Sequence, residues 1–200
     1  MTNYISKSIN YTEYCNLLET LMANGKTTGH DQSESYINYA KLNLARMRRL
    51  NKTVILTEEI KNELQKITKK YIWLVITEGW CGDAAQNIPV FHHIEKENHN
   101  IELCLILRDE NLDLMDNYLT NGSRSIPKLI CLEKDPSTSL GFIERFVWGP
   151  RPEAVQNLTQ QLLHQNITKD EKSLAIQHWY NNDKTLTLQN EFLQLIKTLN

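Results

Sequence analysis

The 200-residue chain lacks the features that mark membrane, secreted and nucleic-acid-binding proteins. Its longest apolar run, Ile72 to Ile76, is far too short to span a bilayer. Its first residues have neither the charged start nor the apolar stretch of a secretory signal. The formal net charge is only −2, so no global basic field favours nucleic acid. These absences predict a cytoplasmic protein with no membrane and no nucleic-acid partner.

Cysteine is scarce, and the four cysteines form no Cys-x-x-Cys pair. No histidine stands at ligand spacing from any of them, which predicts that there is no metal site. In a reducing cytoplasm they should be free thiols. Cys104 and Cys131 lie in apolar runs and are interpreted as core residues, whereas Cys15 in a predicted helix is a remote candidate for a second reacting thiol. Cys81 stands in a loop between two predicted elements and is the candidate reactive thiol.

The composition, with 40% apolar and 23% charged residues, is ordinary for a globular protein. Apolar periodicity and capping residues predict an alternating order of elements from residue 71 onward: strand, helix, strand, helix, strand, strand, helix. Such an order begins with a parallel crossover and ends with an antiparallel pair. The expected strands are 71–77, 101–107, 129–132 and 142–148, and the expected helices are 11–23, one after Ser33, one after Thr57, 112–119, one from Pro152, 170–180 and 185–199.

This order predicts an α/β fold in which a central mixed sheet is flanked by helices. We expect one domain over residues 1–200, divided into a helical N-terminal extension (1–56), a core (57–167) and a helical C-terminal extension (168–200). The second helix carries a basic stripe of Lys41, Arg48 and Arg49, for which a solvated helix face is the favoured interpretation and an acidic partner the alternative.

The segment from Glu78 to Ala84 lies where the first strand leads into a helix. Unpaired backbone N–H groups and the positive end of the helix dipole gather at such a point and stabilise an anion. The sequence therefore predicts an accessible Cys81 whose pKa is lowered. Asp83 is ambiguous, because its charge suits a helix N-terminus but opposes a nearby thiolate. Glu78 could supply a proton, but a place on the solvent-exposed rim is the favoured interpretation.

The motif Trp80-Cys81-Gly82 is followed by Pro89 within the predicted helix and by the segment from Gly122 to Pro127 before the third predicted strand. In these motifs the sequence resembles the thioredoxin superfamily, over roughly residues 70–165. The resemblance implies a thioredoxin-like fold in which the proline of an Ile-Pro pair is cis and faces the active cysteine. It also implies that the backbone of Ile126 pairs with an extended substrate segment. A narrower resemblance is to bacterial proteins with WCGDAAQ-type centres and a WGPRP segment. The residues that match the superfamily are Trp80, Cys81, Gly82, Pro89, Gly122, Arg124, Ile126, Pro127 and Gly149. Those that match the narrower group are Trp80 to Gln86 and Trp148 to Pro152.

The chain departs from the family's pattern at three positions. Ala84 replaces the second redox cysteine, Asp83 replaces the motif proline, and Val75 replaces the buried aspartate that is thought to deprotonate the second cysteine. Without a second thiol, Cys81 can attack a disulfide but cannot release the mixed disulfide that forms. To complete a turnover the site would then need a small thiol such as glutathione, another protein, or a mobile cysteine elsewhere in the chain. No other cofactor is expected.

Three functions remain open at this stage. The favoured one is monothiol–disulfide exchange through Cys81, with protein or low-molecular-weight thiols and disulfides as partners. The alternatives are a non-catalytic protein-binding module and a peroxide-sensing thiol. His92 and His93 lie too far along the helix to form a dyad with Cys81, and Trp179-Tyr180 is interpreted as a core anchor of the terminal helices.

Overall fold

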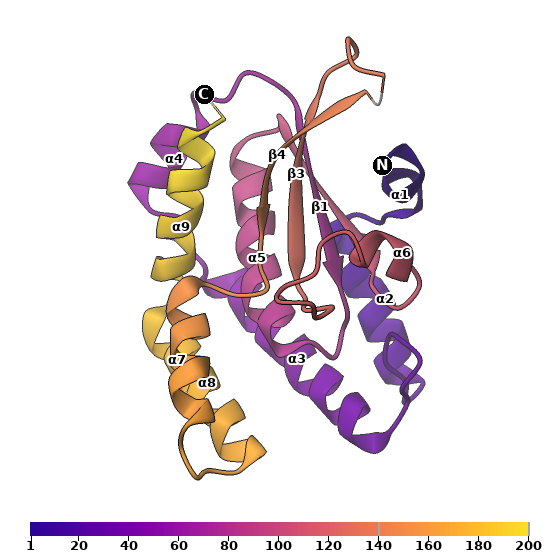
Figure 1. Cartoon of the computed structure of the whole chain (residues 1–200), viewed down its shortest axis with the longest axis vertical. Coiled ribbons are helices and arrows are strands. Elements are labelled where there is room, and N and C mark those ends of the chain that lie inside the picture. Colours follow the sequence, from indigo (N-terminus) through magenta and orange to yellow (C-terminus); the bar gives the residue numbers. More distant parts are fainter. Residues whose placement is uncertain (140, 200) are drawn as a thin grey trace.

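A four-stranded mixed sheet forms the centre of the protein, as Figure 1 shows for the computed structural model, which describes residues 1–139 and 141–199. The strand order is β2-β1-β3-β4; β1 pairs in parallel with β2, while β3 is antiparallel to both β1 and β4. The predicted α/β fold is therefore confirmed. The strands are β1 (Tyr71–Thr77), β2 (Ile101–Leu107), β3 (Lys128–Lys134) and β4 (Phe142–Trp148).

The helices agree with the sequence pattern except at two places. The first is a short helix at the N-terminus that no pattern predicted, because it buries no residue. The second is α6, which ends at Met115 rather than near residue 119, since the chain continues in tighter turns closed by Asn117 and Tyr118. The helices are α1 (Thr2–Lys7), α2 (Tyr11–Ala23), α3 (Glu34–Thr53), α4 (Glu58–Leu64), α5 (Gly82–Glu97), α6 (Leu112–Met115), α7 (Glu153–Leu163), α8 (Lys169–Asp183) and α9 (Leu186–Lys197).

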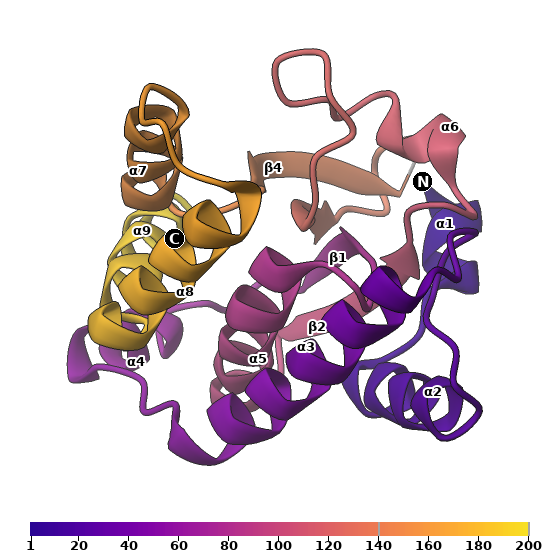
Figure 2. The same cartoon turned by 90° about the horizontal axis from the view of Figure 1, so that it is seen from below.

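The N-terminal part of the chain packs on the sheet and on α5. Ile9 pairs with Leu105 through two backbone hydrogen bonds of 2.9 and 2.8 Å, which covers part of the otherwise open edge of β2. Helix α2 buries Tyr11, Tyr14 and Leu18. Figure 2 shows α5 between α3 and α8, so helices from both ends of the chain flank the helix that begins at Cys81.

The core combines the fully buried strand β1 with an aromatic cluster contributed by distant parts of the chain. Phe192 of α9 contacts the rings of Trp73, Phe91 and Trp148 at centroid separations of 5.2, 4.8 and 5.4 Å. Such pairs add to the free energy gained from burial. Helix α9 is thus part of the hydrophobic core. The division of the chain into a core with two extensions stays a prediction, and Leu140 and Asn200, which fall in the predicted turn and C-terminal extension, lie outside the described residues.

None of the helices in the described part of the chain is both long and apolar enough to cross a membrane.

The burial of Phe192 generates a test of this core. Phe192→Ala should lower the free energy of unfolding by about 3–5 kcal/mol, because it removes a fully buried ring and leaves a cavity. The control is Leu186→Ala in the same helix, where the side chain is about half exposed and the loss should stay below about 1 kcal/mol. Urea unfolding measures both values. Equal losses in the two variants would mean that α9 is not packed as described.

Candidate active site

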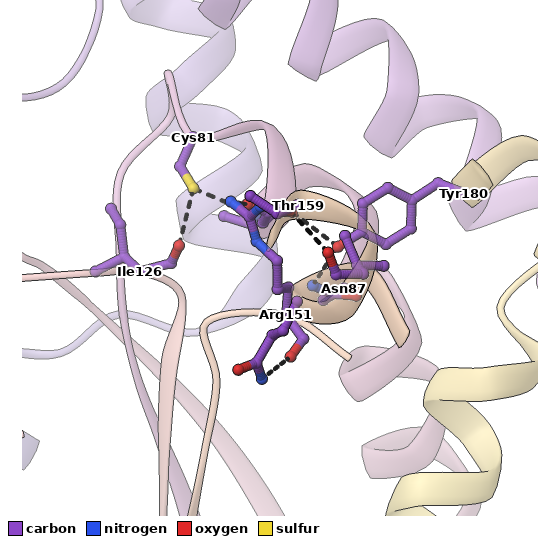
Figure 3. A network of polar contacts seen from close by, with 10 residues as sticks. Cys81, Asn87, Ile126, Arg151, Thr159 and Tyr180 are labelled. Carbon is purple, nitrogen blue, oxygen red and sulfur yellow. Dashed lines mark hydrogen bonds and ion pairs between the residues drawn. The ribbon is translucent and has the colours of Figure 1, made fainter. Parts of the chain in front are cut away.

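Cys81 lies at the N-terminus of α5, directly after the loop that follows β1. Its sulfur accepts a hydrogen bond from the Ala84 backbone N–H at 3.5 Å, which is the contact expected of a cysteine at a helix N-terminus. Its S–H donates to the backbone carbonyl of Ile126 at 3.3 Å, as Figure 3 shows. A thiolate could not make this second bond, since it has no proton to donate.

The residues opposite Cys81 come from two loops in close contact. The Ile126–Pro127 peptide bond is cis, and so is Gly149–Pro150. Gly149 has a φ of +125°, and a Cβ atom there would lie 2.2 Å from the carbonyl oxygen of Pro127. Only glycine fits at this approach. The loop after β4 is therefore held against the Ile126–Pro127 segment beside the sulfur.

The sequence-based expectation of an accessible Cys81 with a lowered pKa is wrong. The residue is only 8% exposed, and burial raises the pKa of its thiol to about 12, with the charge of Asp83 as the second cause. Backbone N–H groups of Ala84 and Asp83 and the Arg151 charge lower it, but by less. At neutral pH only about one thiol in 10⁵ with such a pKa is ionised. Cys81 is held as a neutral thiol.

The negative charge of Asp83 accounts for part of the raised pKa of Cys81. Contacts that the sequence did not predict hold this carboxylate in place. The carboxylate forms an ion pair with Arg151 and accepts a hydrogen bond of 2.8 Å from the Tyr180 hydroxyl. Arg151 also donates to Thr159 at 2.8 Å, and Asn87 lies at 3.5 Å from the Tyr180 hydroxyl. Figure 3 shows this network extending from Cys81 at one end to Tyr180 at the other.

Arg151 and Tyr180 are therefore residues of the site that sequence reasoning missed. Tyr180 was interpreted as a core anchor; it is buried, but its hydroxyl serves the motif at Asp83. Arg151 stands in the WGPRP segment, and an arginine so close to an expected site glycine was the available signal. No sequence signal linked Tyr180 to residues almost one hundred positions earlier.

Glu78 is also placed differently from the expectation. Its side chain is fully buried instead of lying on the rim. One carboxylate oxygen accepts the Asp109 backbone N–H at 2.9 Å, and the other has no hydrogen-bond partner among the described residues. Burial raises the pKa of this carboxyl. The burial follows from Gly79, whose N–H is bonded to Thr28 in the loop before α3, so this loop covers the motif.

Trp80 lies partly exposed at the edge of the site, as expected. Its ring is in edge contact with Tyr36 at 5.1 Å between centroids, and the Arg108 guanidinium lies 4.8 Å from the ring centroid. The cleft that these residues border measures about 460 Å³ and includes the sulfur of Cys81. It brings together the predicted residues Trp80, Cys81, Gly82, Asp83, Arg124 and Ile126 with residues of α3 and α8 that were not predicted as site residues, including Tyr39, Arg46, Lys169 and Ser173.

The remaining candidates lie elsewhere. Cys104 and Cys131 are buried in strands as expected, and Cys15 is half-buried in α2, so Cys81 is the cysteine of the cleft. His92 stacks on Tyr11 and pairs with Glu95. The described residues contain no cluster of histidine, cysteine or acidic side chains suited to a metal ion.

A mixed sheet with a cysteine at the start of the helix after its first strand is the arrangement of a thioredoxin-like domain. The chain belongs to the thioredoxin family, because the family model described as thioredoxin matches residues 29–172. The matched range includes α3 as well as the segment that carries the motifs. No curated protein matches the chain in sequence.

Two solved structures share the fold. The crystal structure of a protein of unknown function from Pseudomonas aeruginosa has a TM-score of 0.57 and 19% identity, covering 94% of this chain and 98% of that one. The crystal structure of an HIV epitope-scaffold has a TM-score of 0.55 with the same identity and coverage. At this identity the likeness concerns the fold alone.

The contact between Asp83 and the thiol generates a prediction about reactivity. Asp83→Asn should lower the pKa of Cys81 by about one unit or more, because it removes the negative charge that opposes the thiolate while keeping the shape of the side chain. The rate of iodoacetamide alkylation against pH measures this value. Asp113→Asn, which changes the same charge near Tyr4 and away from the cleft, should leave the profile unchanged. An unchanged profile for Asp83→Asn would contradict the electrostatic account.

The burial of Glu78 generates a prediction about pH. Because its pKa is raised in the folded protein, this carboxyl contributes fully to stability below the ordinary pKa of 4.5, and the contribution is lost as the pH rises through the folded value. The free energy of unfolding of Glu78→Gln relative to the unmodified protein should therefore increase between about pH 4 and about pH 8. Exposed Glu59→Gln in α4 is the control and should show no such trend. A constant difference for Glu78→Gln would exclude the shift.

Proposed function

We propose that this protein carries out thiol–disulfide exchange through the single thiol of Cys81. The observation that carries the proposal is the position of the sulfur: it lies at the N-terminus of α5, opposite the carbonyl of Ile126, and borders a cleft of ligand size. The family relationship supports a thioredoxin-like domain. We also propose that the protein belongs to the bacterial thioredoxin-like group that has WCGDA-type, single-cysteine centres.

The exchange has two balanced steps. The Cys81 thiol gives its proton to water, and the thiolate attacks one sulfur of a disulfide, so that a mixed disulfide forms and the other sulfur leaves as a thiolate. A second, external thiolate then attacks the mixed disulfide and releases Cys81, which takes up a proton again. After these two steps one half of the substrate is a free thiol and the other half is joined to the external thiol in a new disulfide. A second external thiol reduces that disulfide, so two external thiols are oxidised for each substrate disulfide that is reduced. Ala84 stands where a second cysteine would act, so the resolving thiol comes from solution.

The attack on the disulfide requires a thiolate, so Cys81 must first lose the proton that its neutral thiol holds. An extended substrate segment that pairs with the Ile126 backbone competes for the carbonyl that now accepts the Cys81 S–H. Losing that acceptor removes one contact that favours the protonated form, beside burial and the charge of Asp83, while the Ala84 N–H continues to favour the thiolate. Pro127 and Gly149 shape this segment. A substrate that takes this carbonyl therefore lowers the free-energy cost of ionising Cys81.

The second candidate function is a protein-binding module without turnover. The raised pKa of Cys81 favours it, because a thiol with a pKa of about 12 is nearly inert towards disulfides. The same shift weighs against peroxide sensing, which also requires a thiolate. Both the exchange and the binding function suit a reducing compartment such as the cytoplasm, where small thiols are abundant.

Restoring the second cysteine tests the proposal. Ala84→Cys places a second thiol one helical turn from Cys81 and should create insulin-reducing activity with dithiothreitol, at several times the rate of the unmodified protein. The control is the double variant Cys81→Ser/Ala84→Cys, which should lose this activity.

The unmodified protein should form a mixed disulfide at Cys81 with bis(2-hydroxyethyl) disulfide, which excess thiol releases. Two results together would establish the binding-module function instead. They are no reaction of Cys81 with this disulfide, and binding of a partner protein by the Cys81→Ser variant.

A further inference from the structure

The cleft beside Cys81 is lined by many more basic than acidic side chains. Its lining includes one acidic side chain, Asp83, and five basic ones. The whole chain carries a slight net negative charge, so the imbalance is local. The basic residues of the lining are Arg46, Arg108, Arg124, Arg151 and Lys169.

Three of these cations already have carboxylate partners. Arg108 pairs with Asp109, Arg124 with Asp116 and Arg151 with Asp83. In each pair the carboxylate balances the charge of the arginine. These three arginines therefore give no reason to expect that the cleft binds an anionic ligand.

The other two cations have no carboxylate partner within residues 1–139 and 141–199. Arg46 of α3 is half-buried, and its guanidinium donates at 2.7 Å to the neutral side chain of Asn43. Burial, and after it the nearby Arg49, lower the pKa of Arg46, while the charge of Asp83 raises it from beyond ion-pair distance. Lys169 is exposed at the start of α8. The two residues come from helices on opposite sides of α5, as Figure 2 shows for α3 and α8.

We propose that the cleft binds a small thiol or disulfide that carries two carboxylates, with Arg46 and Lys169 as the groups that receive them. The inference rests on the exchange reaction proposed above and names its substrate class. A carboxylate on Arg46 would form charge-assisted hydrogen bonds in a half-buried setting, where they are stronger than in water. Lys169 supplies a point charge for the second carboxylate.

The shape of the cleft fits a small molecule. Its volume of about 460 Å³ lies within the range of ligand pockets, and an adjoining cavity of about 340 Å³ shares Arg46 and Lys169 with it. Tyr36 and Trp80 form an apolar wall on one side of the sulfur. A ligand held between the two helices thus has its charged groups on the unpaired cations and its sulfur close to Cys81.

The test separates binding from chemistry. S-methylglutathione, which carries two carboxylates but cannot exchange, is titrated by calorimetry into the Cys81→Ser protein. We expect binding that weakens as salt is raised, and at least about tenfold weaker binding of its diethyl ester, which lacks both carboxylates.

Variants locate the site. Arg46→Gln and Lys169→Gln should each weaken the binding of S-methylglutathione about tenfold, the loss expected when a hydrogen bond to a charged group is removed. Arg48→Gln is the matched control, because Arg48 lies on the same helix but pairs with Glu19 away from the cleft. Equal affinity of the diester, or unchanged affinity in both cleft variants, would overturn the inference.

The outcomes also distinguish this inference from the proposed function. Binding of S-methylglutathione by the Cys81→Ser protein, together with an unmodified protein that never reacts with disulfides, would support the anion site and reject the exchange reaction. Reaction of Cys81 with neutral bis(2-hydroxyethyl) disulfide, together with no binding of S-methylglutathione, would do the reverse.

Discussion

The ion pair between Asp83 and Arg151, completed by the Tyr180 hydroxyl, is the interaction on which the arrangement of the site depends. It joins three segments that are remote in sequence: the start of α5, the loop after β4, and α8. The side chain of Asp83 is only 11% exposed and that of Arg151 only 23% exposed, so each charge depends on the other for compensation. Removing one partner of such a pair costs about 3–5 kcal/mol, because a charge is left buried without compensation.

The protonation state of Cys81 depends on its burial first and on the charge of Asp83 second. Asp83 is close enough to oppose the thiolate, and Arg151 offsets only part of that effect, so burial and charge together keep the thiol neutral. The same contacts hold α8 beside α5, and α8 with α3 forms the walls of the cleft. Asp83 therefore opposes the ionisation of Cys81 and, through Tyr180, also holds α8 in place as one wall of the cleft.

Much of the fold could be predicted from the sequence, because the signals are local. The strand at 71–77 follows from its β-branched and aromatic composition, and the helix at 11–23 follows from its apolar periodicity. The accessibility of Cys81 could not be predicted, since it depends on which distant side chains fill the space around it. The loop at Thr28 that covers Glu78 is polar in sequence, and nothing in its composition indicated that it would pack over the motif.

The most direct test of the account is the mass of the intact protein after incubation with oxidised glutathione, followed by peptide mapping. The account predicts one glutathionyl group, bound to Cys81 and released by excess reduced glutathione, with Cys15, Cys104 and Cys131 unmodified. An adduct on Cys15, or no adduct at Cys81 at any pH at which the protein stays folded, would contradict it.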